Sequence, residues 1–255
     1  MKSFYFDNSA TTRMDDRVFE VMRPFFGEAY GNASSIYGLG REARKAVEDA
    51  RERVAGVLNC KPSEIYFTAG GSESDNTAIK GIAREYKNKG NHIITSKIEH
   101  PAVLETCKEL EKEGFEVSYI PVDKYGIVDL EELKKEIRPT TILISIMFAN
   151  NEIGTIEPIK EIGKIAKENG IFFHTDAVQA AGCMKIDVQD LNIDSLSISG
   201  HKFYGPKGVG ILYMKSGIRF QKLISGGHQE RNKRAGTENV PGIVGIAKAL
   251  ELAQD

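Results

Sequence analysis

The sequence has few cysteines, almost no net charge and no long hydrophobic segment, and each shortage excludes a class of protein. Its three cysteines, Cys60, Cys107 and Cys183, are widely spaced and form no Cys-x-x-Cys pair, which argues against a disulfide framework and a metal knuckle. The 34 Lys and Arg residues nearly balance the 36 Asp and Glu residues, so the charge gives no support to a nucleic-acid partner. The longest apolar run, residues 142–149, is broken by Ser145 and is too short to cross a bilayer. Since the start of the sequence also has no apolar segment of signal-peptide length, we expect a cytoplasmic protein without a membrane partner.

Strand and helix patterns alternate along the chain. A hydrophobic content of 41% over 255 residues is enough for one large domain with a substantial core. Short runs rich in β-branched and aromatic residues predict strands at residues 64–68, 92–96, 116–122, 141–148, 171–175, 194–199 and 209–214. Apolar residues three and four apart predict helices at residues 41–57, 101–113 and 159–169, and another helix starts at residues 129–133. This alternation predicts an α/β fold with a mixed, mostly parallel seven-stranded sheet flanked by helices.

The last predicted helix, at residues 241–255, begins at Pro241 and carries a broad apolar face. The sequence indicates nothing that would pack against that face. We therefore expect that the chain has been cut, or that it continues in another polypeptide.

Lys202 lies where a predicted strand meets a tight turn. The stretch Ser199-Gly200-His201-Lys202 ends the strand at residues 194–199 and leads into Gly205-Pro206, which prevents a helix from continuing. In open α/β sheets, ligands bind outside the carboxyl ends of the strands. A lysine is most often a solvated surface group, but this position makes Lys202 a candidate reactive centre.

Two further motifs follow predicted strands. Gly70-Gly71-Ser72 precedes a helical segment and could hold a phosphate against free backbone N–H groups, although the same residues also form ordinary turns and helix caps. Asp176 follows the strand at residues 171–175, where a charged carboxylate needs a cationic partner such as a pyridine nitrogen, unless it simply caps the next helix. A Schiff-base lysine, an acid beneath the ring nitrogen and a phosphate cradle are together what pyridoxal 5'-phosphate requires.

Polar residues in three other loops have both a functional and an ordinary interpretation. His100 could stack on a flat ring and exchange protons near neutral pH, or it could be a solvated loop histidine. Asn151 could bind a phenolate-type oxygen or a substrate carboxylate, or it could stabilise a turn. The glycine-bearing segment 226–239 could contact an anion or a partner subunit, or it could be a solvent-facing connection.

Taken together, these motifs resemble those of the pyridoxal-phosphate-dependent cysteine desulfurases of the NifS/IscS kind, in the class V aminotransferase group with the fold-type I architecture. The resemblance extends from Asp7-Asn8-Ser9-Ala10-Thr11-Thr12 to the last predicted helix, and its most specific part is Ser199-Gly200-His201-Lys202-x-x-Gly205-Pro206-Lys207-Gly208. It implies an enzyme that converts L-cysteine to L-alanine and passes the sulfur to an enzyme cysteine as a persulfide. It also implies a sulfur-acceptor protein, such as an iron–sulfur scaffold, and a role in iron–sulfur cluster or thio-cofactor biosynthesis.

The resemblance also implies roles for individual residues. Lys202 would form the Schiff base with the cofactor and remove the α-proton of the substrate. Asp176 would keep the ring nitrogen protonated, and Gln179 would bind the phenolic oxygen. His100 would stack on the ring and act in proton transfer, and Asn151 would orient cofactor and substrate.

The phosphate site and the domain organisation follow from the same resemblance. The residues that would contact the phosphate are Gly71, Ser72, Ser199 and His201, with Thr237 from the neighbouring subunit of a homodimer. Residues 1–12 would form an arm that contributes to small-domain or dimer contacts, and residues 13–255 would form the cofactor-binding large domain.

The sequence departs from the family pattern in two places. It has Gly-Asn-Ala-Ser-Ser-Ile-Tyr at residues 31–37, where family members usually have Gly-Asn-Pro-Ser-Ser-x-His. It also ends before the small domain that carries the nucleophilic cysteine and the arginine for the substrate carboxylate, and none of its own cysteines matches that motif. Two alternatives therefore stay open: a selenocysteine lyase or another class V lyase or transaminase, and a non-catalytic scaffold or one half of a split enzyme.

Overall fold

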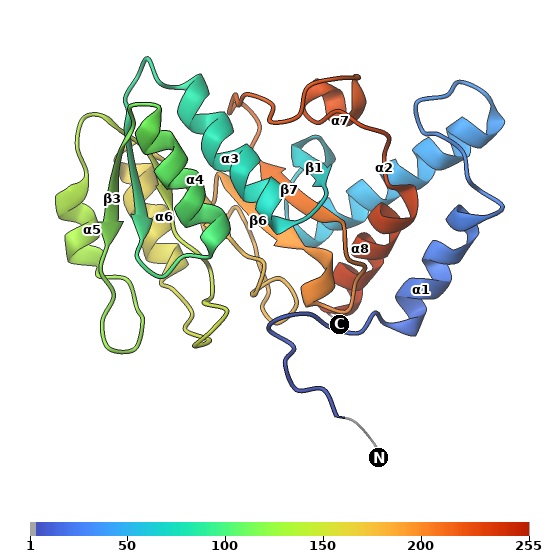
Figure 1. Cartoon of the computed structure of the whole chain (residues 1–255), viewed down its shortest axis with the longest axis horizontal. Coiled ribbons are helices and arrows are strands. Elements are labelled where there is room, and N and C mark those ends of the chain that lie inside the picture. Colours follow the sequence, from blue (N-terminus) through green and yellow to red (C-terminus); the bar gives the residue numbers. More distant parts are fainter. Residues whose placement is uncertain (1–3, 255) are drawn as a thin grey trace.

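The computed structural model describes residues 4–254 and has a central sheet between layers of helices (Figure 1). Residues 1–3 and 255, which fall in the predicted arm and the predicted last helix, lie outside the described residues. The helices are α1 (Asp16–Met22), α2 (Gly38–Leu58), α3 (Gly71–Glu85), α4 (Pro101–Lys112), α5 (Leu130–Glu136), α6 (Ile159–Glu168), α7 (Gln229–Asn232) and α8 (Val240–Leu252). The strands are β1 (Ile65–Thr68), β2 (His92–Ser96), β3 (Glu116–Ile120), β4 (Thr141–Ser145), β5 (Phe172–Asp176), β6 (Ser195–Ser199) and β7 (Gly210–Met214). All seven predicted strands form within a few residues of their expected bounds.

The strands form one sheet in the order β1-β7-β6-β5-β4-β2-β3. The pairs β2–β3, β2–β4, β4–β5 and β5–β6 are parallel, whereas β7 runs antiparallel to both of its neighbours. The prediction of a mixed, mostly parallel seven-stranded sheet is therefore confirmed. Because neighbouring parallel strands end at the same edge, polar residues that follow β4, β5 and β6 come together there.

Alternate residues of the central strands pack into two apolar clusters, as expected for strands buried on both faces. Ile94 belongs to the larger cluster, which includes Ile162 of α6. Its neighbour Ile93 belongs to the smaller cluster, with Ile79 of α3 and Leu110 of α4. Figure 1 shows α3 and α4 together on one side of the sheet. The sheet is thereby held rigidly between helices, which fixes the edge that carries the polar residues.

Helix α8 confirms the last predicted helix, but the expectation that nothing packs against its apolar face is wrong. The helix lies against α1 and α2 (Figure 1), and Ile243, Ile246 and Leu250 are buried. The contact with α1 is close, because a Cβ atom on Gly245 would lie 2.5 Å from the sulfur of Met22. The partners of α8 are thus supplied by the beginning of the chain, about two hundred residues away.

Two short helices were not predicted from the sequence. Helix α1 is capped by Asp15, whose side chain accepts a hydrogen bond from the backbone N–H of Arg17. Helix α7 contains Glu230 and Arg231 in the left-handed region, a conformation that no simple periodicity indicates. Among residues 4–254, no helix has the length and apolar character needed to cross a membrane.

Candidate active site

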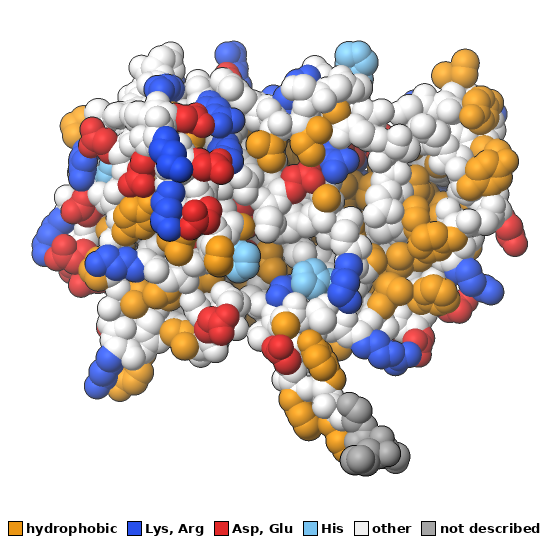
Figure 2. Space-filling model, in the orientation of Figure 1, with side chains coloured by type: hydrophobic (Ala, Val, Ile, Leu, Met, Phe, Trp, Pro, Cys, Tyr) orange, Lys and Arg blue, Asp and Glu red, His pale blue; other side chains and the backbone are white. Residues whose placement is uncertain are grey.

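A cavity of about 440 Å³ opens at the carboxyl ends of β5 and β6, beside the first residues of α3. The structure brings together all predicted site residues except Thr237, and these are Gly71, Ser72, His100, Asn151, Asp176, Gln179, Ser199, His201 and Lys202. Histidine, basic and acidic side chains gather on this part of the surface, near the base of the N-terminal segment (Figure 2).

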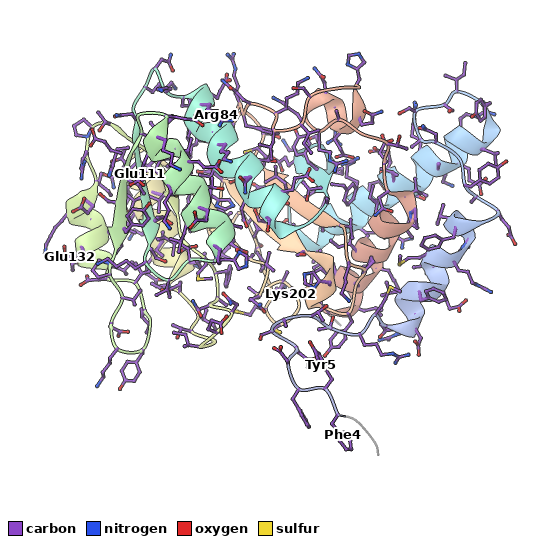
Figure 3. The ribbon with its side chains drawn as sticks, in the orientation of Figure 1. Phe4, Tyr5, Arg84, Glu111, Glu132 and Lys202 are labelled. Atoms are coloured by element: carbon purple, nitrogen blue, oxygen red, sulfur yellow. The ribbon has the colours of Figure 1, made fainter. Side chains whose placement is uncertain are left out.

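Lys202 projects from a 3-10 turn, Gly200–Lys202, that directly follows β6. The turn needs glycine at position 205, because a Cβ atom there would lie 2.7 Å from the carbonyl oxygen of Gly200. The Lys202 amine donates hydrogen bonds to the backbone carbonyls of Ser9 and, at 3.0 Å, Ala10. Figure 3 shows Lys202 next to the N-terminal segment that carries Tyr5. Burial lowers the pKa of the Lys202 amine, and the nearby Asp176 carboxylate opposes this shift. A lowered pKa increases the fraction of neutral amine, which is the nucleophilic form.

The glycine loop after β1 approaches the neighbouring connection closely. A Cβ atom on Gly71 would lie 2.6 Å from Cγ2 of Val178, so a larger residue cannot enter without moving one of the two segments. Gly71 and Ser72 begin α3, a helix of 15 residues whose N-terminal end carries partial positive charge. Ser199 and His201 line the same cavity from the opposite loop. These features fit a phosphate group held at the start of α3.

Asp176 ends β5 as a buried carboxyl group in the floor of the cavity. Its Oδ1 accepts a hydrogen bond from the Val178 backbone N–H at 2.9 Å, and burial raises its pKa. Asp75 lies in the same floor, and burial and the charge of Asp176 raise its pKa well above the usual value. A cationic ring nitrogen placed against Asp176 would offset the cost of its buried charge.

His174, which precedes Asp176 on β5, does not line the cavity. Its Nδ1 lies 2.8 Å from the Ser145 hydroxyl, and its Nε2 lies 3.1 Å from the Ser197 hydroxyl and 3.6 Å from Oδ1 of Asp75. Burial lowers the pKa of His174 to about 3, so the ring is neutral near pH 7. It therefore supports the strand ends without supplying a cation to the buried acids.

The beginning of the chain closes one side of the cavity. Asp7, Ser9 and Ala10 are among its lining residues, although the sequence alone assigned no reaction to this loop. The Gln179 side chain donates to the Ser9 carbonyl at 3.0 Å, and the ring of His201 lies 3.0 Å from the Thr11 hydroxyl. Residues at the start of the chain thus form part of the cavity wall.

Sequence reasoning did not single out two buried carboxyl groups in or beside the site: Asp75, which lines the cavity, and Glu99, which directly precedes His100. Oε1 of Glu99 accepts hydrogen bonds from the Ser96 hydroxyl at 2.5 Å and from the Met147 backbone N–H at 2.9 Å. Burial raises the pKa of Glu99 to about 8. The only sequence signal was position, since each residue lies within a few places of a predicted site residue.

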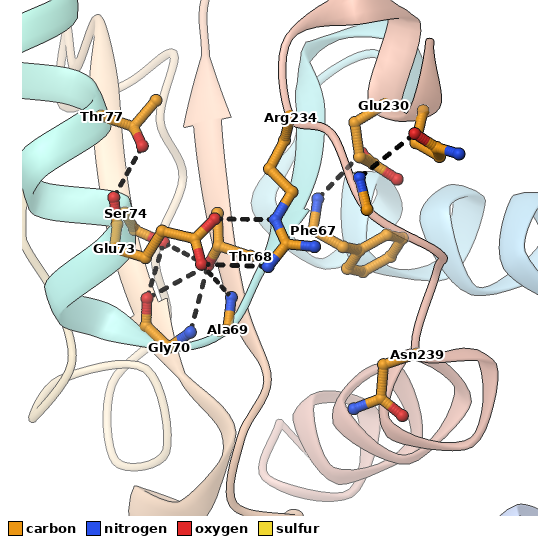
Figure 4. Close-up of polar contacts among 12 residues, drawn as sticks. Phe67, Thr68, Ala69, Gly70, Glu73, Ser74, Thr77, Glu230, Arg234 and Asn239 are labelled. Atoms are coloured by element: carbon orange, nitrogen blue, oxygen red, sulfur yellow. Dashed lines mark hydrogen bonds and ion pairs between the residues drawn. The ribbon is translucent and has the colours of Figure 1, made fainter. Parts of the chain in front are cut away.

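The polar segment 226–239 packs against α2, β1 and the start of α3 (Figure 4). Arg234 forms an ion pair with Glu73 of α3 at 2.9 Å. Glu230 forms a buried ion pair with Arg51 at 2.8 Å and accepts the Phe67 backbone N–H. Thr237 is exposed and does not line the cavity of its own chain. Its predicted contact with the cofactor of a neighbouring subunit stays a prediction.

The three cysteines do not line the cavity. Cys107 is buried, Cys60 is half-buried and Cys183 is exposed. Burial raises the pKa of both Cys60 and Cys107 to about 12, which disfavours their reactive thiolate forms. None of the three thiols is placed to act as a nucleophile in this cavity.

Comparisons of the sequence and the structure with known proteins all point to the same family. The family model described as aminotransferase class-V matches residues 4–255. A cysteine desulfurase IscS of Clostridium botulinum is 61% identical over 254 residues, which are 100% of this chain and 64% of the relative. A solved structure of a NifS-like protein superimposes with a TM-score of 0.97 at 50% identity, covering 99% of this chain and 70% of the other. A structure of SspA in complex with cysteine gives a TM-score of 0.95 at 45% identity, covering 98% of this chain and 72% of the other. The chain thus spans 64% of the length of the Clostridium botulinum relative.

Proposed function

Because the chain belongs to the aminotransferase class V family, we propose that it is the cofactor-binding part of a pyridoxal-phosphate-dependent cysteine desulfurase. Its substrate would be L-cysteine and its products L-alanine and a protein-bound persulfide. One observation carries the proposal: Lys202, Asp176 and the glycine loop at the start of α3 line the same cavity. The cysteine named with the similar SspA structure supports the choice of substrate.

The residues of this chain would hold the cofactor at three points. The amine of Lys202 would hold it covalently, Asp176 would face its ring nitrogen, and the N-terminal end of α3 with Gly71 and Ser72 would bind its phosphate. When bound, pyridoxal phosphate supplies an aldehyde for the substrate amine and a ring that withdraws electrons from the adjacent carbon. The remaining contacts that we assign to cofactor or substrate come from His100, Asn151, Gln179, Ser199 and His201.

Lys202 would also move the proton that the reaction takes from the substrate. Burial lowers the pKa of its amine, which favours the neutral form that can accept a proton. Its hydrogen bonds to the carbonyls of Ser9 and Ala10 orient the amine toward the side of the cavity that the N-terminal segment covers. The carboxyl group of Asp176 below the cavity would keep the ring nitrogen protonated.

The thiolate that receives the sulfur would come from outside this sequence, because Cys60, Cys107 and Cys183 do not line the cavity. We assign residues 13–255 to the large domain and residues 1–12 to an arm that takes part in small-domain or dimer contacts. In a cytoplasmic homodimer, Thr237 of one subunit would reach the phosphate of the other. The sulfur would serve iron–sulfur cluster or thio-cofactor synthesis through an acceptor protein.

Cofactor reconstitution tests the proposal directly. We expect the 255-residue chain to bind pyridoxal phosphate with the absorbance of a lysine-bound cofactor, and reduction with borohydride followed by peptide mass spectrometry to locate the label on Lys202. Lys202→Ala should abolish the label, whereas Lys207→Ala, a change at an exposed lysine of the same loop, should keep it. A colourless wild-type chain, or a label on another lysine, would refute the assignment.

Product analysis then distinguishes desulfuration from related chemistry. With an excess of an external thiol, one thiol receives the sulfur as a persulfide and a second reduces that persulfide to sulfide with formation of a disulfide, so L-cysteine should yield alanine and sulfide in equal amounts. Formation of a keto acid would indicate a transaminase, and a strong preference for selenocysteine would indicate a selenocysteine lyase.

A further inference from the structure

Thr12 is a buried residue, only 4% exposed, that bonds to the backbone on both sides of Lys202. Its hydroxyl group lies 2.8 Å from the carbonyl oxygen of His201 and 2.7 Å from the backbone nitrogen of Tyr204. Its backbone N–H donates a further hydrogen bond to the His201 carbonyl at 2.9 Å. One residue from the beginning of the chain thus holds the segment that carries Lys202, across 189 positions of sequence.

The chemistry of the two backbone groups determines how the Thr12 hydroxyl is oriented. A backbone N–H can only donate and a carbonyl oxygen can only accept. The hydroxyl oxygen therefore accepts the bond from Tyr204, and its hydrogen is donated to His201. A valine has nearly the same shape as threonine but can form neither bond, whereas a serine can form both. Position 12 thus needs a hydroxyl group to hold both backbone groups.

The turn that carries Lys202 includes an unfavourable backbone conformation, which the N-terminal segment supports. The N–H of Gly205 donates to the Gly200 carbonyl at 3.0 Å, which brings the two ends of the turn together. Within the turn, Tyr204 has a φ angle of 63°, a left-handed conformation that is unfavourable for a residue with a Cβ atom. Its N–H donates to Thr12, and its carbonyl accepts the backbone N–H of Asp15 at 2.9 Å. The backbone next to the lysine is therefore stabilised by contacts from the beginning of the chain.

The residues just before Thr12 contact the other end of Lys202. The lysine amine donates hydrogen bonds to the backbone carbonyls of Ser9 and, at 3.0 Å, Ala10. Thr12 holds the backbone of the lysine turn, and the Ser9 and Ala10 carbonyls hold the amine. A movement at Thr12 would therefore change the position of the lysine at both its ends.

We infer that Thr12 is a positioning residue for Lys202, and that its hydroxyl group keeps the lysine amine within the cavity. The role of that amine rests on the proposed function, but the hydroxyl contacts do not. Thr12 does not line the cavity, so it acts through Lys202 and not on a bound molecule. If Thr12 only stabilised the fold, its loss would weaken every property of the site to a similar extent.

Amide hydrogen exchange tests the Thr12 contact in the unaltered protein, without cofactor or substrate. The Tyr204 N–H should exchange at least about tenfold more slowly than in an unstructured peptide of the same sequence, because it is bound to the Thr12 hydroxyl. In Thr12→Val this protection should be lost, and in Thr12→Ser it should remain. An unprotected Tyr204 N–H in the wild-type protein would overturn the inference, even if the valine variant does not fold.

The pH dependence of Lys202 labelling tests whether Thr12 positions the amine. Burial lowers the pKa of Lys202, and the charges of Asp176, Asp7 and Glu152 oppose this shift. Because burial is the largest of these influences, an amine that moves toward solvent should titrate at higher pH. Trace acetylation at a series of pH values, read by peptide mass spectrometry, should therefore give Lys202 a higher midpoint in Thr12→Val than in wild type or Thr12→Ser. Equal midpoints in all three proteins would overturn the inference.

Two related ligands separate the positioning of Lys202 from general support of the site. Pyridoxal phosphate can be attached to the lysine through its aldehyde, whereas pyridoxamine 5'-phosphate has an amine in that place and binds without a covalent bond. Thr12→Val should weaken binding of pyridoxal phosphate about tenfold, the effect of about one hydrogen bond, and change the affinity for pyridoxamine 5'-phosphate by less than about twofold. Thr12→Ser should match wild type for both ligands.

The outcomes of the ligand experiment distinguish this inference from the proposed function. Equal losses of affinity for both ligands in Thr12→Val would show a general structural role of Thr12 and overturn the inference. If the wild-type protein binds neither ligand, the proposed function fails, while the exchange and labelling results still decide whether Thr12 positions Lys202.

Discussion

Glu99 gives the sharpest expectation for stability, because it is a buried acid whose pKa differs strongly between the folded and unfolded protein. Its side chain is only 4% exposed, and burial raises its pKa from 4.5 to about 8. The second carboxyl oxygen, Oε2, is buried without a hydrogen-bond partner. An ionised Glu99 therefore pays a desolvation cost that only the two bonds to Oε1 reduce.

The direction of the pH effect follows from proton counts. Between about pH 4.5 and about pH 8 the folded protein keeps the Glu99 proton that the unfolded chain releases. Folding then requires uptake of a proton, so stability falls as pH rises through this window. At about 1.4 kcal/mol per pH unit, the full displacement of the pKa corresponds to about 5 kcal/mol of stability lost by pH 8.

Glu99→Gln removes this loss and keeps the acceptor for Ser96 and Met147. We expect wild type and variant to have similar stability near pH 5, and the variant to become more stable than wild type as pH rises to 8. Urea denaturation at a series of pH values measures the difference in free energy of unfolding between the two proteins. The contributions of the other buried acids cancel in this difference, because both proteins contain them. Glu157→Gln is a control in which the same effect should be smaller, because burial raises the pKa of Glu157 only to about 7. Parallel stability curves for wild type and Glu99→Gln would show that Glu99 is ionised in the folded protein.

The remaining predictions concern the glycine loop and the buried ion pair. Gly71→Ala should weaken pyridoxal phosphate binding about tenfold or more, as measured in an absorbance titration. The reason is that the new Cβ would lie 2.6 Å from Cγ2 of Val178 and displace the start of α3. Unchanged affinity would contradict the assignment of the phosphate to this loop. Gly56→Ala, where a Cβ atom meets no other atom within 4 Å, should leave binding unchanged and raise helix stability by about 0.5–1 kcal/mol. Arg51→Met leaves Glu230 buried without its partner and should cost about 3–5 kcal/mol in urea denaturation. The double change with Glu230→Met should recover part of that loss, and a full additive loss would show that the two residues do not interact.

The sequence alone was enough to predict those parts of the fold that depend on local patterns of residues. Each predicted strand combined β-branched residues with a clear end, and the residues that follow β4, β5 and β6 meet because parallel strands end at the same edge. Asp176 and Lys202 could be predicted as partners for this reason. The shifted pKa values of Glu99 and Asp75 could not be predicted, because they arise from burial and, for Asp75, from the charge of Asp176, which no local pattern indicates.

Long-range packing accounts for the other differences. The backbone at Glu230 and Arg231 is left-handed, and the buried bond from Arg51 to Glu230 holds it there across 179 positions of sequence. The apolar face of α8 looked unpaired because its partner α1 lies at the opposite end of the chain. In both cases the decisive contact joins segments that lie far apart in the sequence.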